Sequence, residues 1–448
     1  MQESSDFQFS SMSTLPRKLG LFSAVAVLVG STIGSGIFRS PAGIAERIPN
    51  ESLFFLAWII GGVCVLAGAL TYAELASALP YTGGVFVYLK EGLGPLPAFL
   101  FGWAELTIVR ASALGAIATV FAEYLLRMLG TGSSRDAVHY VAAGSILIVA
   151  ALNIRGVSIS AFVQNMTASA KYLALLALVA ASFILGNSAA SPASAATATS
   201  GTSISSFGLA LISILWVYDG WADVTFVSGE VKRPERYLAR ALIIGTFAVV
   251  AIYLLTNLAY AHVFSMTQIS RSELVAADVA SHLIGTAGVT LVSLAVMISA
   301  FGTLNGSMMT GPRILFAMAD DGLFFKNISA VHPRFRTPHV AIGLAALLAS
   351  IFVMFRNFEQ LADAFVLGIW PFYAGGVAAV YVLRRKRPDL QRPYKVPGYP
   401  VTPAVFLAAA ILLLVNALLA ERMTLLVFGI IATGIPVFWI WHGGVRDV

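Results

Sequence analysis

The sequence reads VGSTIGSGIFRSP from Val29 to Pro41, in the middle of its first long apolar run, which extends over about residues 19–48. A helix that crosses lipid normally keeps all its backbone hydrogen bonds internal. Glycine weakens a helix, and serine offers the backbone a competing hydrogen-bond partner. Because Gly34, Ser35 and Gly36 follow one another here, we expect the helix to break at this point.

The two ends of such a break carry opposite partial charges. The first half-helix would end with the free carbonyl groups of residues 31–33, and the second would begin with the free N–H groups of residues 35–38. The ammonium and carboxylate of a free α-amino acid match this polarity. Irregular backbone at membrane depth is tolerated only where it lines a cavity, so the stretch predicts a binding site inside a bilayer. Alternatively, its small residues only allow close helix packing, as GxxxG motifs do.

The composition indicates a membrane protein that crosses the bilayer several times. Of its 448 residues, 58% are hydrophobic and 11% are charged, whereas soluble domains have roughly 25% charged residues. The one cysteine, Cys64, lies in an apolar stretch, so we expect no intramolecular disulfide, no cysteine-based metal site and no disulfide-linked partner subunit. The sequence contains no nucleotide-binding loop and no HExxH or GxSxG motif, so we expect neither a pump nor an enzyme, and no cofactor.

Apolar runs of about 20 residues predict twelve membrane-spanning segments. They lie near residues 19–48, 52–79, 95–128, 137–154, 159–186, 206–230, 238–263, 287–318, 338–356, 360–384, 401–420 and 424–442. The small polar residues of 187–205 predict an exposed loop. We therefore expect an all-α membrane protein with a single transmembrane domain over residues 1–448.

The basic residues predict which side of the membrane each loop occupies. With the N-terminus in the cytoplasm, 19 of the 28 Lys and Arg residues fall in cytoplasmic positions, 6 in external positions and 3 near or within spans. The six external residues are Arg47, Arg127, Arg135, Arg271, Arg356 and Arg422, and the three near spans are Arg39, Arg110 and Lys171. This bias follows the positive-inside rule and predicts that both termini are cytoplasmic. It also accounts for the net charge of +6 without a nucleic-acid partner.

A second interruption stands in the sixth predicted span, which reads WVYDGWAD from Trp216 to Asp223. A charged group at mid-membrane costs at least about 2.5–3.5 kcal/mol on insertion scales, so Asp219 needs a polar cavity, a partner or a proton. Breaks in the first and sixth spans predict two five-helix halves related by inversion, residues 19–186 and 206–386, followed by two helices within 401–443. This is the layout of a secondary transporter whose site lies between the halves.

Five motifs, in the same order, resemble those of a known family. They are GSGIF (Gly34–Phe38) followed by Pro41; YAEL (Tyr72–Leu75) followed by Pro80, Gly83 and Gly84; YDGW (Tyr218–Trp221) followed by EVKRPE (Glu230–Glu235); NGS (Asn305–Ser307) followed by Arg313; and RPYKVPGYP (Arg392–Pro400). Over residues 15–403 the chain is similar to the amino acid–polyamine–organocation (APC) superfamily, and within it to the L-amino-acid transporter branch. The resemblance implies a LeuT-like fold, an amino-acid substrate and a place in the inner (plasma) membrane.

The resemblance also implies which residues bind the substrate. Backbone N–H groups of Gly34, Ser35 and Gly36 would bind the carboxylate. Carbonyl groups in both breaks would bind the ammonium, at Ser31, Thr32, Trp216 and Val217, and the site would be completed by Ile33, Tyr218, Asp219 and Gly220. The Trp216 side chain would form an aromatic lid. Asp219 either caps the unwound backbone or contacts a cationic group of the substrate.

Two basic residues lie inside predicted spans. Arg110 matches a family arginine that is usually followed by proline, but Ala111 follows it here. Lys171 either extends its ammonium to the membrane surface or, as the resemblance implies, replaces a sodium ion beside the break of the first helix. In the second case it could also carry the proton of a symporter.

Three carboxylates, Glu74, Glu230 and Asp320, lie near cytoplasmic helix ends beside Lys and Arg. They form either a thin cytoplasmic gate or ordinary solvated helix ends.

Together these features predict a sodium-independent exchanger of neutral L-amino acids that works by alternating access. One alternative is a proton-coupled symporter of amino acids, including cationic amino acids or polyamines. The other is an amino-acid sensor that binds its ligand without transporting it.

Overall fold

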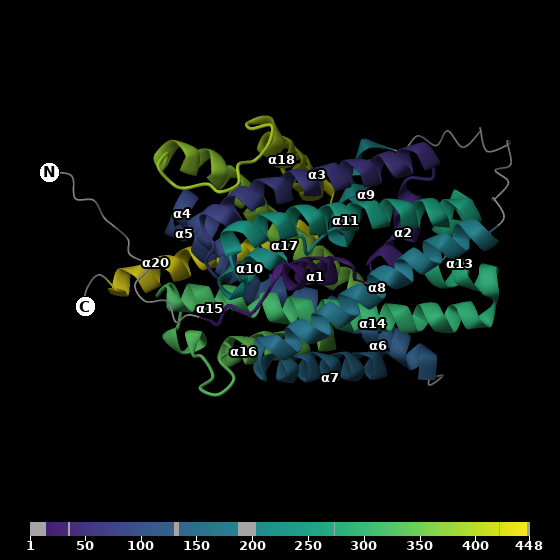
Figure 1. Ribbon diagram of the computed structural model, residues 1–448, viewed down its shortest axis with the longest axis horizontal. Coiled ribbons are helices and arrows are strands. Elements are labelled where there is room, and N and C mark those ends of the chain that lie inside the picture. Colours follow the sequence, from purple (N-terminus) through teal and green to yellow (C-terminus); the bar gives the residue numbers. More distant parts are fainter. Residues whose placement is uncertain are drawn as a thin grey trace.

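The computed structural model describes residues 15–34, 36–129, 134–186, 203–272, 274–420 and 422–445. Within these ranges the chain is a bundle of helices, and its one extended pairing is a bridge between Leu19 and Val231 (Figure 1). The helices up to residue 185 are α1 (Leu21–Thr32), α2 (Gly36–Arg47), α3 (Glu51–Ala78), α4 (Val85–Leu93), α5 (Pro95–Ala104), the π-helix η1 (Glu105–Val109), α6 (Arg110–Leu129), α7 (Arg135–Ile154) and α8 (Val157–Leu185).

The remaining helices follow residue 203. They are α9 (Ile204–Val217), α10 (Asp223–Phe226), the 3-10 helix η2 (Ser228–Glu230), α11 (Pro234–Val263), α12 (Met266–Ser270), α13 (Val275–Ile284), α14 (Thr286–Thr310), α15 (Pro312–Asp320), the 3-10 helix η3 (Lys326–Ser329), α16 (His339–Phe355), α17 (Phe358–Lys386), α18 (Val401–Ala420), α19 (Arg422–Ala432) and α20 (Gly434–Val445).

Eight helical segments in the described part of the chain are long and apolar enough to cross a membrane. They are Glu51–Ala78, Pro95–Leu126, Arg135–Ile154, Val157–Leu185, Pro234–Val263, Thr286–Asp320, Gln360–Lys386 and Val401–Leu419. A ninth candidate is the pair α1 and α2, bent by 40° at a short break, so the predicted break in the first span is confirmed. The predicted spans 206–230, 338–356 and 424–442 contain shorter or interrupted helices, so the count of twelve and the inverted repeat stay predictions.

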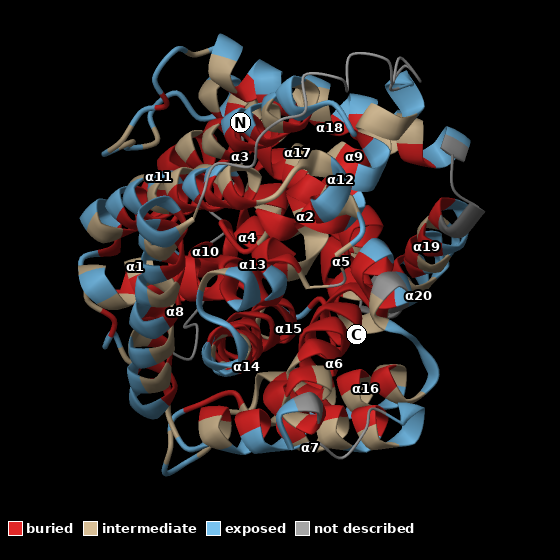
Figure 2. Cartoon of the chain, turned by 90° about the vertical axis from the view of Figure 1, so that its right-hand side faces the viewer, coloured by how far each residue is buried: buried red, intermediate tan, exposed pale blue. Residues whose placement is uncertain are grey.

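The surface between the two ends of the bundle is apolar. Large hydrophobic side chains are exposed on the outer helices, for example Phe162 and Leu173 on α8 and Leu412 on α18. Figure 2 shows buried residues in the middle of the bundle and exposed ones on the outer faces of α7 and α8. Soluble proteins rarely expose so much contiguous apolar surface, so this surface is suited to contact with lipid.

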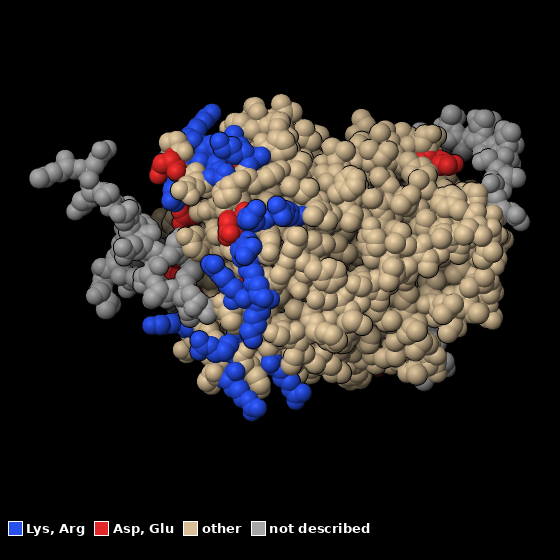
Figure 3. Space-filling view, in the orientation of Figure 1, with Lys and Arg blue, Asp and Glu red and all other residues tan. Residues whose placement is uncertain are grey.

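The charged residues gather at one end. On the face drawn in Figure 3, Lys and Arg side chains cluster at the end where α15 and α20 lie in Figure 1, and little charge interrupts the rest of that face. We call this end, where the last described helix finishes, the terminal end, and the opposite one the distal end.

α1 lies inside the bundle, packed against α8, α11 and α14. A small residue allows this approach, because a Cβ atom on Gly30 would stand 2.0 Å from the Nε2 atom of Gln164 on α8. Gln164 belongs to a chain of buried amides: its Oε1 accepts a hydrogen bond from Asn305 Nδ2 on α14 (3.1 Å), and Asn305 Oδ1 accepts one from Asn153 Nδ2 on α7 (3.1 Å). Polar side chains in membranes bond across helices in this way, so the helices around α1 are tied together.

Backbone hydrogen bonds and an ion pair close the terminal end. The N–H groups of Lys18 and Leu19 donate to the Glu230 carbonyl oxygen (2.9 Å each), and the Lys232 N–H donates to the Leu19 carbonyl oxygen (2.7 Å). The segment before α1 is therefore fixed to the segment after α10. The Glu230 carboxylate pairs with Arg313 on α15 at 2.8 Å, and both side chains are 1% exposed.

We expect Glu230→Gln to destabilise the protein, because it leaves the buried Arg313 guanidinium without its counter-charge. Removing one member of a buried ion pair typically costs about 3–5 kcal/mol. The apparent unfolding temperature of the detergent-solubilised protein should therefore fall by several degrees. Glu235→Gln is the control, because Glu235 is exposed at the start of α11. An equal fall in both variants would contradict the prediction.

Candidate functional site

The first helix breaks inside the bundle. α1 ends at Thr32, the N–H of Gly34 donates to the Thr32 carbonyl oxygen (2.8 Å), and α2 begins at Gly36. Ser31 and Thr32 are both buried. Ser35, one of the predicted carboxylate-binding residues, lies outside the described residues.

The second break meets the first. α9 ends at Val217 and α10 begins at Asp223, and between them Gly220 has a φ of +101°, which favours glycine. A Cβ atom on Gly220 would stand 2.8 Å from the carbonyl carbon of Ser31 and 2.8 Å from the nitrogen of Thr32. Both breaks that the sequence predicts are therefore present, and their backbones touch.

Lys171 on α8 binds the carbonyl groups at the first break. Its Nζ donates to the carbonyl oxygens of Gly30 (2.6 Å), Ile33 (2.6 Å) and Ser299 (3.2 Å), and to the Thr303 Oγ1 atom (2.9 Å). The residue is 1% exposed, so its ammonium does not reach the membrane surface. A buried charge needs such oxygen partners in place of water.

A cavity of about 50 Å³ lies beside the two breaks. It is lined by Ser31, Thr32, Gly34, Gly36, Arg110, Ala113, Ile117, Trp216, Val217, Asp219, Gly220, Asp223, Thr303, Ser307 and Phe365. Eight of the eleven predicted binding residues are in this set. One water molecule takes up about 30 Å³ in the liquid, so an amino acid fits only if the lining moves.

Two predicted binding residues lie away from the cavity lining. The Ile33 carbonyl oxygen accepts hydrogen bonds from Lys171 and from the Ser299 Oγ atom (3.0 Å). The Tyr218 ring packs edge-on against Trp58 with centroids 5.6 Å apart, and its hydroxyl donates to the Trp58 carbonyl oxygen (3.4 Å). Successive residues of an irregular segment point in different directions, so adjacency in sequence does not place all of them at one cavity.

Arg110, one member of a buried ion pair, lines the cavity. Arg110 donates through Nε to Glu105 Oε2 (3.0 Å) and through Nη1 to Ser307 Oγ (2.8 Å). In an α-helix, side chains five positions apart would point about 140° away from each other. Glu105–Val109 is instead a π-helix, whose i→i+5 turn brings Glu105 and Arg110 together. The helix is thus irregular beside Arg110 although Ala111 follows it instead of proline.

Two aspartates of the second break line the same cavity. Asp223 Oδ2 accepts a hydrogen bond from Thr310 Oγ1 on α14 (2.8 Å). Asp219 Oδ1 is buried and has no hydrogen-bond partner among the described residues. Such an oxygen is costly in a medium of low dielectric constant, so Asp219 would gain from a cationic or N–H partner in the cavity. Within the described ranges, no group of three or more His, Cys, Asp or Glu side chains could hold a metal ion.

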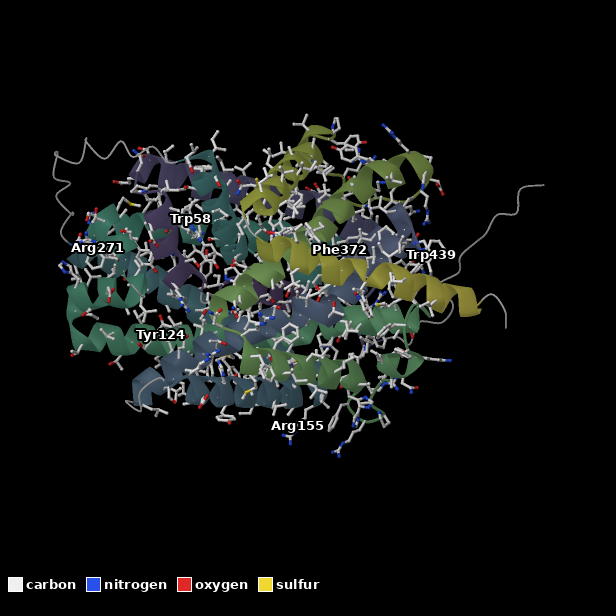
Figure 4. The ribbon with its side chains drawn as sticks, turned by 180° about the vertical axis from the view of Figure 1, so that it is seen from behind. Trp58, Tyr124, Arg155, Arg271, Phe372 and Trp439 are labelled. Atoms are coloured by element: carbon white, nitrogen blue, oxygen red, sulfur yellow. The ribbon has the colours of Figure 1, made fainter. Side chains whose placement is uncertain are left out.

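Aromatic rings separate this cavity from a larger one. Trp216, the predicted lid, packs edge-on against Phe365 (5.2 Å between centroids) and Phe358 (6.3 Å). Phe358 also lines a cavity of about 960 Å³, together with Ser270 and Ser272. Arg271, which lies between these serines in sequence, is at the distal end, opposite Trp439 (Figure 4). The larger cavity therefore lies toward the distal end.

The three predicted gate residues lie at the terminal end. Glu74 Oε2 accepts a hydrogen bond from Arg384 Nη2 on α17 (2.6 Å), and Glu230 forms the buried pair described above. Asp320 ends α15, and the residue after it forms an ion pair with Lys90 on α4. These contacts hold several helix ends together, and their role as a gate stays a prediction.

Sequence reasoning missed several residues beside the breaks, among them Glu105, Tyr253, Ser299, Thr303 and Phe365. Glu105 had a detectable signal, because a carboxylate in the third predicted span carries the same insertion cost as Asp219. Ser299 and Thr303 gave no detectable signal in the sequence, because Ser and Thr in membrane helices usually bond to their own backbone. Phe365 is one of many aromatic residues in apolar spans.

Comparison with known proteins gives matches over nearly the whole chain. The sequence model of the family described as amino acid permease matches residues 19–440. The serine/threonine exchanger SteT of Bacillus subtilis (strain 168) is 32% identical over 431 residues, which are 95% of this chain and 97% of that protein. The human b(0,+)-type amino acid transporter 1 is 31% identical over 389 residues, 86% of this chain and 79% of its own. The human cystine/glutamate transporter is 30% identical over 431 residues, 95% of this chain and 85% of its own.

The matched region contains both breaks, Lys171 and every residue that lines the central cavity. The chain therefore belongs to the amino acid permease family of the APC superfamily, whose members transport amino acids across membranes.

Proposed function

We propose that this protein is a sodium-independent exchanger of neutral L-amino acids, which bind between the two helix breaks and cross the membrane by alternating access. The observation that carries the proposal is the position of the Lys171 ammonium among the carbonyl oxygens of the first break. The relative named as a serine/threonine exchanger supports exchange, and the relative named as a cystine/glutamate transporter supports an amino-acid substrate.

The bonding of Lys171 supports sodium independence. In transporters with broken helices, unwound carbonyl groups commonly coordinate the coupling cation. Here a tethered ammonium binds the carbonyl oxygens of Gly30, Ile33 and Ser299. Because this ammonium is part of the protein and fills the place of a coupling cation, transport would not draw on a sodium gradient.

The helix breaks supply a reason for exchange. Backbone groups at a break have no partner in their own helix, and each unsatisfied group in a medium of low dielectric constant costs several kcal/mol. Protein donors already bind the carbonyl oxygens of Gly30, Thr32 and Ile33. A bound amino acid would satisfy the remaining groups of the breaks with its ammonium and carboxylate. The loaded protein would then pass through its closed conformation more easily than the empty one, so that each inward movement is matched by an outward one.

The charges and size of the cavity favour a small neutral amino acid. Arg110 is paired with Glu105, and Asp223 accepts a hydrogen bond from Thr310, which leaves Asp219 Oδ1 as a partner for the substrate ammonium. The cavity of about 50 Å³ lies against the Trp216 and Phe365 rings, so a long cationic side chain would need a large displacement of the lining.

A proton-coupled symporter is the second candidate. It is favoured by the two carboxylates, Asp219 and Asp223, that line the buried cavity, because a proton is an efficient way to neutralise such a group inside a membrane. A sensor, the third candidate, would bind at the same breaks and give no flux.

The proposed orientation rests on charge. Lys and Arg gather at the terminal end (Figure 3), so by the positive-inside rule we infer that this end faces the cytoplasm and that both termini lie there. The large distal cavity would then open to the outside of the inner (plasma) membrane. Movement of the halves 19–186 and 206–386 against each other would open the other side.

Proteoliposomes prepared without sodium test the proposal. We expect labelled serine, alanine or leucine to enter vesicles that are preloaded with unlabelled amino acids, with saturable kinetics, and not to enter empty vesicles. Uptake into empty vesicles driven by an acidic exterior would establish proton symport instead. Binding without uptake would establish a sensor, and strong competition by arginine would overturn the neutral substrate class.

We expect Lys171→Ala to lower exchange to near background, because it removes the only ammonium bound to the carbonyl oxygens of the first break in the described residues and leaves them with the Ser299 and Thr303 hydroxyls as donors. The measurement is the initial rate of exchange, normalised to the amount of protein in the membrane. Ser182→Ala is the control on the same helix, because the Ser182 hydroxyl bonds only to Leu178 of α8 in the described residues. Exchange at the wild-type rate in Lys171→Ala would refute the role proposed for this lysine.

We expect Gly220→Ala to lower exchange by at least about tenfold, equivalent to 1.4 kcal/mol in a rate-limiting barrier. The added methyl group would push the two breaks apart at Ser31 and Thr32. Gly322→Ala is a matched control, because Gly322 also has a positive φ (+80°) but has open space around its Cβ position. If both variants lose the same activity, backbone strain and not the contact between the breaks is responsible.

A further inference from the structure

The distal cavity collects arginines. Its volume is about 960 Å³, and Arg39, Arg47, Arg135 and Arg356 all line it. The acidic side chains in the lining are two, Glu46 and Glu123. Arg39 and Glu123 form an ion pair (3.5 Å), so the excess of positive charge comes from Arg47, Arg135 and Arg356, with Glu46 as the remaining carboxylate. A cavity of this size takes up a free amino acid without displacing protein atoms.

Membrane topology does not explain why these arginines lie together at the distal cavity. The positive-inside rule depletes basic residues from external loops, and only six Lys or Arg residues of the sequence fall in predicted external positions. Three of those six, Arg47, Arg135 and Arg356, line this one cavity, and Arg39, from near the first span, joins them. Residues that serve only solubility would be expected to spread over the distal end.

Two of the arginines are held in place by the protein. Arg47, at the end of α2, donates through Nη1 to Ser213 Oγ (2.7 Å) and to the Leu209 carbonyl oxygen (3.2 Å) on α9. The Arg39 guanidinium lies 4.5 Å from the centroid of the Phe358 ring. These contacts fix both guanidinium groups in place, Arg39 as the ion-paired partner of Glu123 beside the aromatic layer.

The other two arginines are exposed at helix ends. Arg135 begins α7 and Arg356 follows the last residue of α16, and both side chains are exposed to solvent. A guanidinium presents a planar set of N–H donors that matches a carboxylate in two parallel hydrogen bonds. Exposed and conformationally free arginines can form and release such bonds quickly.

A set of contacts leads from Arg39, in the lining of the distal cavity, to the central cavity. Arg39 lies over Phe358, Phe358 packs on Trp216, and Trp216 lines the central cavity. Positive charge in a cavity with walls of low dielectric constant raises the local concentration of negatively charged groups. A carboxylate held in the distal cavity is therefore one aromatic layer away from the breaks.

We propose that the distal cavity is a separate, transient binding site for the α-carboxylate of an incoming amino acid, with Arg135 and Arg356 as its exchangeable ligands. The inference rests on the proposed function and adds to it a second site on one face only. The site acts on capture, so it lowers the external KM and leaves the turnover rate unchanged. It contributes most for acidic amino acids, which carry two carboxylates, and least for cationic ones.

The test compares the two faces of the membrane. Initial rates of labelled L-serine exchange are measured in intact cells and in inside-out vesicles from the same cells, for wild type, Arg135→Gln, Arg356→Gln and the double variant. We expect the KM of the double variant to rise three- to tenfold on the face with the distal cavity and to stay unchanged on the other, with the maximal rate unchanged on both. Inhibition by external L-glutamate should weaken by a larger factor.

Two controls separate charge at this cavity from charge in general. Arg271→Gln removes the same charge at the same end of the bundle, but Arg271 is not among the residues that line the cavity, so its KM should match wild type. Arg135→Lys and Arg356→Lys keep the charge and should recover at least half of the lost affinity. Raising the ionic strength should increase the external KM of wild type and have little effect on the double variant.

The outcomes distinguish this inference from the proposed function. If wild type exchanges amino acids and the double variant has the same KM on both faces as wild type, the distal site is refuted and exchange stands. An equal rise on both faces, or an equal effect of Arg271→Gln, also refutes it. If the KM follows chloride at constant ionic strength, the cavity binds an inorganic anion and not a carboxylate. If wild type transports no amino acid in any assay, the proposed function itself fails.

Discussion

The structure depends on how buried backbone groups are satisfied where the first helix breaks. In lipid, no water replaces the hydrogen bonds that a broken helix loses. Three neighbouring helices supply donors instead: Lys171 on α8, the Tyr253 hydroxyl on α11, which donates to the Thr32 carbonyl oxygen (2.8 Å), and the Ser299 and Thr303 hydroxyls on α14. These are the same three helices that pack around α1. The position of α1 inside the bundle therefore follows from the need to satisfy its break.

The sequence predicts the breaks because their causes are local. Runs of glycine and serine, and an aspartate in an apolar span, weaken a membrane helix wherever they occur. The residues around the central cavity are less predictable, because they depend on which way each side chain points. Ile33 and Tyr218 stand next to cavity residues in sequence but bond elsewhere, to Lys171 and Trp58. Glu105 reaches Arg110 only through a π-helical turn, which no spacing rule for α-helices anticipates.

The number of membrane spans is also hard to predict from local sequence. An apolar run such as 206–230 is long enough to cross a bilayer, but α9 within it ends at Val217, so helix length alone does not identify the span. A break that lines a cavity also divides the span into helices that are too short to meet a length criterion. The predicted gate residues can be recognised in the sequence by their charges. Their partners cannot, because they come from distant segments, as when Glu74 binds Arg384.

The two ends of the bundle differ in how their charged side chains are arranged, and this difference bears on the proposed alternating access. At the terminal end, the exposed basic residues surround pairs that are buried, as in the 1% exposed Arg313 and Glu230. A buried pair gains little net free energy over its separated, hydrated members, because attraction is offset by desolvation. Such pairs can therefore open when water enters, at a small net cost. At the distal end, arginines exceed carboxylates around an open cavity.

In the function proposed above, recognition in the central cavity is shared between backbone and side chains. The backbone groups of the two breaks match the ammonium and carboxylate that all α-amino acids share. Lys171, Arg110 and Asp223 already have protein partners, whereas Asp219 Oδ1 has none in the described part of the chain. If the proposed substrate binds here, we expect the change in bonding at Asp219 and the change in size at the Trp216 and Phe365 rings beside it. Selection of the substrate side chain would then depend on few groups, which can differ between relatives while the broken helices stay the same.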